Sequence, residues 1–250
     1  MKLARVKTQD GIHYAQIQDG EAIVLEGNPF EEVKVSRKRI GSGEYRLLAP
    51  SEPKNIVAVG LNYRSHAQEL GMEIPKEPLI FSKWATSVLD PGGIIKKPEV
   101  CKRLDYEAEL AFVVGKQCKS IVPAKAQEYI LGYTCLNDVT ARDLQQTDGQ
   151  WARCKGFDTF SPFGPWIETE FDPLHAHVRA ILNGNTVQEG YTSDYIFDVY
   201  RILAYVSSFM TLYPGDVVTT GTPGGIGPME PGDQISIVVD GIGELKNMIG

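Results

Sequence analysis

The pattern of hydrophobic and polar positions predicts a chain built mainly from β-strands. Residues 110–114 form a continuous apolar run, rich in β-branched and aromatic side chains and closed by Gly115. A short run of this kind is typical of a buried strand. Residues 56–59 predict another short strand. The β-rich runs 217–220 and 234–239 each follow a Pro-Gly-Asp turn.

The first fifty residues have a different pattern, in which short segments of alternating polar and apolar residues are separated by Asp-Gly pairs. Such pairs favour the tight turns of β-hairpins. The alternating segments cover residues 2–6, 12–17 and 22–25. We therefore predict a small N-terminal β subdomain over residues 1–50 and a larger catalytic unit over residues 51–250.

Helical periodicity is confined to a few segments. Apolar positions recur at helical spacing across residues 193–212, and a proline in the first turn of 123–130 favours a second helix. Ser65 and Gln68 have the spacing of a capping box, and Gly71 suits the position after a helix end. The helix predicted between them is barely one turn, so tertiary contacts or a ligand must stabilise it.

Carboxylates lead directly into the strand predicted at residues 110–114. Because successive side chains of a strand point to opposite faces, Glu107 and Glu109 share a face, with Asp105 one step behind. Carboxylates entering a buried strand repel one another unless a cation lies among them. Mg²⁺ and Mn²⁺ prefer such oxygen ligands, which indicates a metal site. The alternative is a strand end with a solvated acidic face.

Two helical segments carry further candidates. His66 and Glu69 are three residues apart and share a face, where the carboxylate would raise the basicity of the imidazole and form an acid/base pair. A surface histidine beside a surface glutamate is the alternative. Asp138 precedes a helix-like run in which Arg142 and Gln145 share a face, and Asp138 is equally suited to cap that helix.

Two lysines and a glycine-rich segment complete the set of candidates. Lys155 opens a segment too rich in Gly and Pro for a helix interior, where a lysine is usually solvated. Lys83 ends a strand candidate at residues 78–83. Residues 221–227 lack the Gly-Lys-Ser/Thr of a P-loop, and no helix follows as a dinucleotide fingerprint requires. Their backbone N–H groups could still hold a carboxylate.

Composition narrows the class of protein. The 250 residues are 42% hydrophobic and 23% charged, as in an ordinary globular protein, and the net charge of −7 argues against nucleic-acid binding. No apolar run approaches the ~18 residues that span a membrane. The N-terminus lacks the apolar core of a signal peptide. Four scattered cysteines without a Cys-x-x-Cys pattern suggest reduced thiols in the cytoplasm rather than disulfides or a zinc site.

Taken in chain order, these segments resemble the fumarylacetoacetate hydrolase family. The resemblance covers about residues 50–250, and no single segment carries it. The matching segments are residues 62–69, 105–109, 137–143, 155–159, 221–223 and 241–245.

The resemblance implies an α+β, mainly β fold, a mixed sandwich-like roll with peripheral helices that usually forms a homodimer. It implies a Mg²⁺ or Mn²⁺ site from Glu107, Glu109 and Asp138, and a catalytic pair of His66 and Glu69 on a mobile lid. Lys155 would join them in catalysis. The implied substrate-binding residues are Arg142, Gln145, Gly221, Thr222 and Lys83.

The expected chemistry is metal-assisted and takes place next to the ketone of a small 2-oxo or 2-hydroxy-enol carboxylate. The metal would stabilise the enolate that forms when a C–C or C–H bond breaks. Hydrolysis of an acylpyruvate, decarboxylation of a β-keto acid such as oxaloacetate, and isomerisation of an unsaturated dioate all remain open. Two rivals are a non-catalytic module that binds a metal–oxoacid complex and a purely structural β protein.

Overall fold

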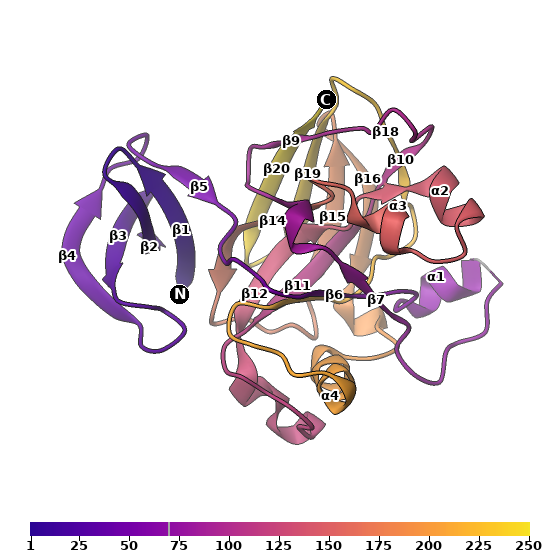
Figure 1. Ribbon diagram of the computed structural model, residues 1–250, viewed down its shortest axis with the longest axis horizontal. Helices are drawn as coiled ribbons and strands as arrows, with labels where there is room; N and C mark the ends of the chain where they lie inside the picture. The colour runs from indigo at the N-terminus through magenta and orange to yellow at the C-terminus, as the bar shows by residue number, and fades with distance from the viewer. Residues whose placement is uncertain (70) are drawn as a thin grey trace.

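The computed structural model describes residues 1–69 and 71–250, which form two lobes joined by one continuous sheet (Figure 1). The smaller lobe is the N-terminal one, and its hairpins are those predicted. Asp19 and Gly20 have φ of 52° and 81°, the positive values that a type I′ hairpin turn requires. The strands of this lobe are β1 (Lys2–Thr8), β2 (Gly11–Gln18), β3 (Glu21–Glu26), β4 (Lys34–Ile40) and β5 (Arg46–Leu48).

The large sheet runs in the order β4-β3-β2-β1-β14-β12-β11-β17-β6-β7, with β5 on β1 and β8 on β14. The predicted buried strand is β11, which lies between β12 and β17, and all of its residues are buried. The strands contributed by the larger lobe are β6 (Ile56–Val59), β7 (Ile80–Lys83), β8 (Val88–Leu89), β11 (Ala108–Val114), β12 (Ile130–Asn137), β14 (Ser161–Glu168) and β17 (Val217–Thr219).

A second sheet, in the order β16-β15-β19-β20-β9, covers one face of β11 and β12. Leu110 and Phe112 on that face share a core with Val178 and Ile237 of the second sheet. Its strands are β9 (Ile94–Ile95), β15 (His177–Leu182), β16 (Asn185–Tyr191), β19 (Gln234–Val239) and β20 (Gly243–Ile249). A third, small sheet comprises β10 (Leu104–Tyr106), β13 (Thr140–Ala141) and β18 (Gly227–Met229).

The helices are short and lie around the outside of the sheets (Figure 1). The predicted fold class, mainly β with mixed sheets and peripheral helices, is confirmed. The α-helices are α1 (Arg64–Glu69), α2 (Arg142–Thr147), α3 (Ala152–Gly156) and α4 (Val199–Phe209), and the 3₁₀ helices are η1 (Ala85–Ser87), η2 (Pro123–Tyr129) and η3 (Thr192–Asp194).

The helix predicted over residues 123–130 is present as the 3₁₀ helix η2, with Pro123 at its start. Two other helix predictions need correction. The α-helix predicted across 193–212 covers only α4, because Asp198 caps it by accepting a hydrogen bond from Arg201 N at 2.8 Å. The capping box at Ser65 is wrong. Its backbone N–H and hydroxyl donate to Asp194 at 2.9 and 2.5 Å, so a carboxylate from η3 satisfies the start of α1.

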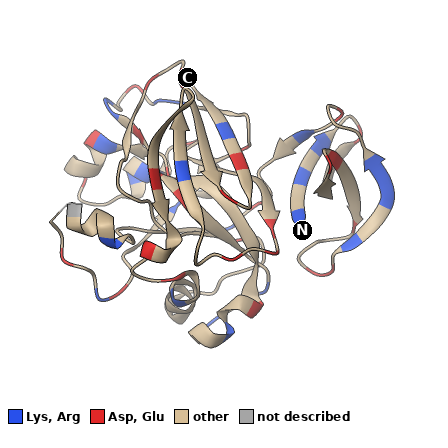
Figure 2. Ribbon diagram, turned by 180° about the vertical axis from the view of Figure 1, so that it is seen from behind, with Lys and Arg blue, Asp and Glu red and all other residues tan. Residues whose placement is uncertain are grey.

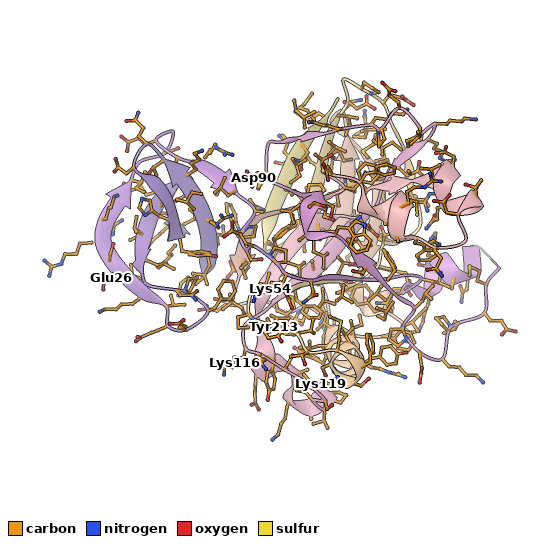
Figure 3. All side chains as sticks on the ribbon, in the orientation of Figure 1. Glu26, Lys54, Asp90, Lys116, Lys119 and Tyr213 are labelled. Carbon is orange, nitrogen blue, oxygen red and sulfur yellow. The ribbon has the colours of Figure 1, made fainter. Side chains whose placement is uncertain are left out.

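A few polar contacts join the two lobes. Strand β1 pairs with β14, and Asp90, which Figure 3 shows between the lobes, accepts hydrogen bonds from Ala49 N at 2.8 Å and Arg46 Nη1 at 3.1 Å. The N-terminal lobe is thus attached through both backbone and side-chain contacts.

Charge is unevenly spread over the smaller lobe. The blue ribbon segments in Figure 2 mark basic residues along its outermost strand, β4. These side chains are Lys34, Arg37, Lys38 and Arg39. In the ranges that the structure describes, no helix combines the length and apolar character needed to cross a membrane. All four cysteines are free and buried.

Candidate metal centre and active site

The chain changes from the small sheet to the large sheet at Glu107. Strand β10 ends just before this residue and β11 begins just after it. The N–H of Glu107 donates to Asn137 Oδ1 and the N–H of Ala108 donates to Gln188 Oε1, both at 2.9 Å. Because these side-chain amides accept both bonds, the backbone can turn here without leaving a buried donor unpaired.

This turn brings three carboxylates together. One oxygen from each of Glu107, Glu109 and Asp138 lies within 4.8 Å of the others. The three residues are only 6%, 1% and 0% exposed. The alternative of a solvated acidic strand end is therefore wrong.

Two buried lysines are interleaved with these carboxylates. Lys155 Nζ donates to Glu107 at 2.8 Å and to Asp138 at 2.6 Å. Lys83 Nζ donates to the other oxygen of Asp138 at 2.5 Å. Burial lowers the pKa of Lys83, whereas for Lys155 burial is outweighed by Asp138 and Glu107, which raise its pKa. Asp138 thus holds two ammonium groups in place.

Arg142 extends the alternation of charges. Its Nη2 donates to Glu107 at 2.5 Å, its Nε donates to Asp105 at 2.9 Å, and its Nη1 donates to Gln145. Asp105 is fully buried and also accepts two hydrogen bonds from Arg103, at 2.8 and 3.1 Å. Asp105 therefore fixes the guanidinium that faces Glu107.

Glu109 differs from the other two carboxylates. No ion pair among the described residues includes it, and its Oε2 accepts a hydrogen bond from Gly221 N at 2.8 Å. Burial, together with Asp138 and Glu107, raises the pKa of Glu109 well above its ordinary value. Burial also acts on Glu107, but Lys155 and Arg142 outweigh it and lower the pKa of that carboxyl to about 2.

This donor set fits a hard divalent cation. Three buried carboxylates offer the oxygen ligands that Mg²⁺ and Mn²⁺ prefer. Glu109 is the carboxylate of the cluster to which the described residues supply no cationic partner, so a bound cation would be most favourable beside it. The residues present could therefore hold Mg²⁺ or Mn²⁺.

Two sequence interpretations around this cluster are wrong. Asp138 does not cap a helix, since α2 begins only at Arg142 and Ala141 occupies the N-cap position. Lys155 is not solvated, because it belongs to the short helix α3 and is 2% exposed. Its charge is accommodated inside the protein by Glu107 and Asp138, as a buried ion requires.

The segment proposed as a lid contains His66. This residue lies in α1, is 9% exposed and lines the same cavity as Glu107 and Lys155. The side chain of Glu69 and the whole of Leu70 lie outside the described part of the structure, so the pairing of His66 with Glu69 stays a prediction.

The chain just before α1 is firmly anchored by Asn62, which is fully buried. Its Nδ2 donates to the carbonyl oxygens of Phe197 at 3.0 Å and Thr220 at 2.7 Å, and its Oδ1 accepts from Phe197 N at 2.9 Å. Gly221 follows directly with φ +87°, and a Cβ there would lie 2.8 Å from the Cβ of Asn62. The entry to α1 and the backbone donor to Glu109 are therefore packed against each other.

Thr222 continues the glycine-rich loop and lines the cavity. Its hydroxyl donates to Ala108 O at 2.9 Å and accepts from Gln188 Nε2 at 2.8 Å. The loop thus holds one carboxylate of the protein itself, that of Glu109. Its expected contact with a substrate carboxylate stays a prediction.

The cavity beside the cluster has a volume of about 700 Å³. Its polar side chains include His66, Glu107, Arg142, Gln145 and Lys155. The remaining members of the predicted site, which are Lys83, Glu109, Asp138 and Gly221, contact one another or Lys155 without lining the cavity. The structure thus places the described candidates in one region.

Sequence reasoning missed the side chains that support the site. Asn137 and Gln188 accept the backbone hydrogen bonds at the turn between β10 and β11, and Asn62 anchors the loop before α1. Asn137 could have been suspected, since it directly precedes Asp138. Gln188 gave no signal, because it lies in a hairpin 80 residues from its partner Ala108.

Comparison with known proteins agrees with this geometry. Residues 55–250 match the family model described as fumarylacetoacetate (FAA) hydrolase C-terminal, and residues 1–50 match a model described as Rv2993c-like, N-terminal. The chain belongs to the fumarylacetoacetate hydrolase family.

Three similar proteins cover essentially the whole chain. Protein Rv2993c of Mycobacterium tuberculosis is 42% identical over 100% of this chain and 98% of its own length. The structure of 5-carboxymethyl-2-hydroxymuconate delta-isomerase from Mycobacterium smegmatis is 41% identical, with a TM-score of 0.94 and coverage of 100% and 99%. The structure of 2-hydroxyhepta-2,4-diene-1,7-dioate isomerase from Mycobacterium marinum is 40% identical, with a TM-score of 0.93 and coverage of 100% and 98%.

Proposed function

We propose that this protein is a Mg²⁺- or Mn²⁺-dependent enzyme that cleaves a C–C bond in 2-oxo or 2-hydroxy-enol carboxylates. The observation that carries the proposal is the convergence of Glu107, Glu109 and Asp138 beside a cavity lined by His66 and Lys155. Family membership supports an enzyme, and the acidic cluster supports the metal.

Each part of the site has a role in this reaction. When bound, the divalent cation would polarise the 2-oxo group and favour negative charge on its oxygen. Lys155 and Arg142 place positive charge at the same end of the cavity, where negative charge develops as the bond breaks. His66, with Glu69 as its proposed partner, takes a proton from water and returns it.

Hydrolysis of an acylpyruvate balances with water alone. His66 takes a proton from the water as its oxygen bonds to the C4 carbonyl carbon. The C3–C4 bond then breaks, its electron pair stays on C3, and a proton is delivered to C3, so the products are pyruvate and a carboxylic acid. Decarboxylation of oxaloacetate breaks the bond to the departing CO₂ instead and leaves the same electron pair on C3.

Isomerisation of an unsaturated 2-hydroxy dioate, or keto–enol exchange of oxaloacetate, is a second candidate function. The names of two structural neighbours at 40% and 41% identity favour it. In this case His66 would move a proton between carbon and oxygen, and no C–C bond would break. A non-catalytic module that binds a metal–oxoacid complex is a minor alternative.

The remaining parts of the proposal concern the setting of the enzyme. We propose a cytoplasmic homodimer that acts on a small oxo-carboxylate and has neither a nucleic acid nor a membrane as its partner. We also propose that residues 1–50 form a subdomain distinct from the catalytic unit at 51–250.

A substrate screen tests the proposal. Oxaloacetate, acylpyruvates and unsaturated 2-hydroxy dioates are incubated with enzyme and Mg²⁺ or excess chelator, and the products are identified by NMR. Release of pyruvate with an acid, or of CO₂, supports C–C cleavage, whereas a shifted double bond alone supports the isomerase. Full activity in chelator, or in Glu107→Ala with Mg²⁺, would refute the metal site.

A further inference from the structure

The cavity has two ends of opposite character. Beyond Lys155 the wall becomes apolar at once, since Lys155 Nζ lies 5.2 Å from the ring centre of Phe81. The Phe81 ring in turn meets Trp151 edge-on, with ring centres 5.1 Å apart. Leu61 and Ile226 are further apolar side chains that line the cavity.

The apolar end is packed tightly against strand β6 and its following residue, Gly60. A Cβ added to Gly60 would lie 3.0 Å from Trp151 and 3.1 Å from Leu79, so both side chains rest on the backbone there. Leu79 is nevertheless 48% exposed, and Met72, which also lines the cavity, is 53% exposed. Large apolar groups open to solvent in a concave site are typical of a surface that a ligand covers.

The arginine and the lysine that line the cavity are both at its polar end, where they contact Glu107. Among the lining residues that the structure describes, the basic side chains are His66, Arg142 and Lys155. Arg142 and Lys155 are already ion-paired with carboxylates of the cluster. The charged residues that line the cavity along the segment after α1 are acidic, namely Glu73 and Glu77.

From this distribution we propose that the end of the substrate remote from the 2-oxo acid is an uncharged, apolar alkyl or aryl group. The preferred class is then an acylpyruvate with such an acyl group, rather than a dioate or oxaloacetate. A second carboxylate on the substrate would leave water to lie against aromatic rings and near two glutamates. Neither the arginine nor the lysine of the cavity is free to pair with it, so its burial would be unfavourable. Leu79, Phe81 and Trp151 are the specificity-determining residues. This inference rests on the proposed function.

A matched pair of unreactive ligands tests the inference directly. 2-Oxooctanoate and 2-oxooctanedioate have the same chain length and differ only in a terminal methyl or carboxylate. In calorimetric titrations of the full chain with Mg²⁺, we expect the monoacid to bind at least about tenfold more tightly. Equal binding, or tighter binding of the diacid, would overturn the inference and leave the proposed function intact.

Oxalate binding distinguishes a failure of this inference from a failure of the proposed function. It presents a chelating pair of oxygens but has no remote end, so it tests only the polar end of the cavity. If oxalate and both longer acids fail to bind in the presence of Mg²⁺, the proposed function fails and this inference fails with it.

Variants at the cavity mouth provide a second, independent measurement. Leu79→Arg adds a cation at a half-exposed position and should shift the affinity ratio towards the diacid by about tenfold or more. Glu77→Gln should shift the ratio in the same direction by a smaller factor. Val122→Arg, at a 55% exposed position that does not line the cavity, is the control and should leave the ratio unchanged. A ratio unchanged in both mouth variants would overturn the inference.

Discussion

Glu109 should limit the stability of the protein whenever the metal is removed. It is the cluster carboxylate without a described cationic partner, and burial with two neighbouring carboxylates raises its pKa. We therefore predict that Glu109→Gln stabilises the protein in excess chelator, because the amide keeps an oxygen for the N–H of Gly221 and removes a charge.

The size of the effect follows from the separation of the carboxylates. At 4.8 Å and an effective dielectric constant of about 20, two like charges repel by about 3.5 kcal/mol. The wild-type protein relieves part of this repulsion through the raised pKa of Glu109. We expect about 1–3 kcal/mol of stabilisation, which corresponds to about 2–12 °C in Tm for a chain of this length.

Glu107→Gln should have the opposite sign. Glu107 is paired with Lys155 at 2.8 Å and with Arg142 at 2.5 Å, and losing a partner from a buried pair costs about 3–5 kcal/mol. The expected decrease in Tm is about 6–20 °C. Glu26→Gln, which alters an exposed pair with Lys34 on the N-terminal lobe, is the matched control and should change Tm little.

The assay is a thermal melt of each protein in chelator, followed by a titration with Mg²⁺. At a hundredfold excess over Kd, a ligand stabilises the native state by about 2.7 kcal/mol, and the wild-type protein should show this gain. Both cluster variants should lose most of the gain. If Glu109→Gln were destabilised in chelator as much as Glu107→Gln, our inference that Glu109 lacks a cationic partner would be wrong.

Four further predictions can be checked separately. His66→Ala should lower kcat by about 10²–10⁴-fold while oxalate binding persists, and a kcat within twofold of wild type would exclude His66 as the base. Gln188→Leu should weaken Mg²⁺ binding in calorimetry, because Ala108 N loses its hydrogen-bond acceptor beside the cluster. Unchanged affinity would show that the backbone turn between β10 and β11 does not need Gln188. Gly221→Ala should lower Tm, since φ is +87° and the new Cβ would press on Asn62; an unchanged melt would contradict this. The four thiols are buried and their pKa values are raised by burial, so a thiol reagent at pH 8 should react only after denaturation, and rapid labelling of the native protein would count against the packing.

The local part of the fold and site could be predicted from the sequence. Strand β11 is short, continuously apolar and fully buried, and the alternation before it predicted a shared face for Glu107 and Glu109. The hairpin at Asp19 also depends only on neighbouring residues. Information of this kind is carried by side-chain periodicity and turn preference, both of which are short-range.

The rest depends on contacts between distant residues. Lys83 and Asp138 are 55 positions apart, and nothing in the segment around either lysine indicated that both ammonium groups are buried. The same is true of the change of sheet at Glu107, which Gln188 supports from another strand. The start of α1 was predicted wrongly for a related reason, because the residue that caps it, Asp194, belongs to a separate element. Tertiary context overrides local preference in such cases.

The basic strand β4 has a consequence for how copies of this protein meet. It is one of the two edge strands of the large sheet, so its outward backbone groups could template the addition of a strand from another molecule. A second β4 approaching this edge would bring its own lysines and arginines towards the four already there, three of which pair with Glu26, Asp10 and Glu21. Charged side chains of this kind on an edge strand disfavour the addition of a strand from another molecule. We therefore expect ordered assembly of this protein to use other surfaces.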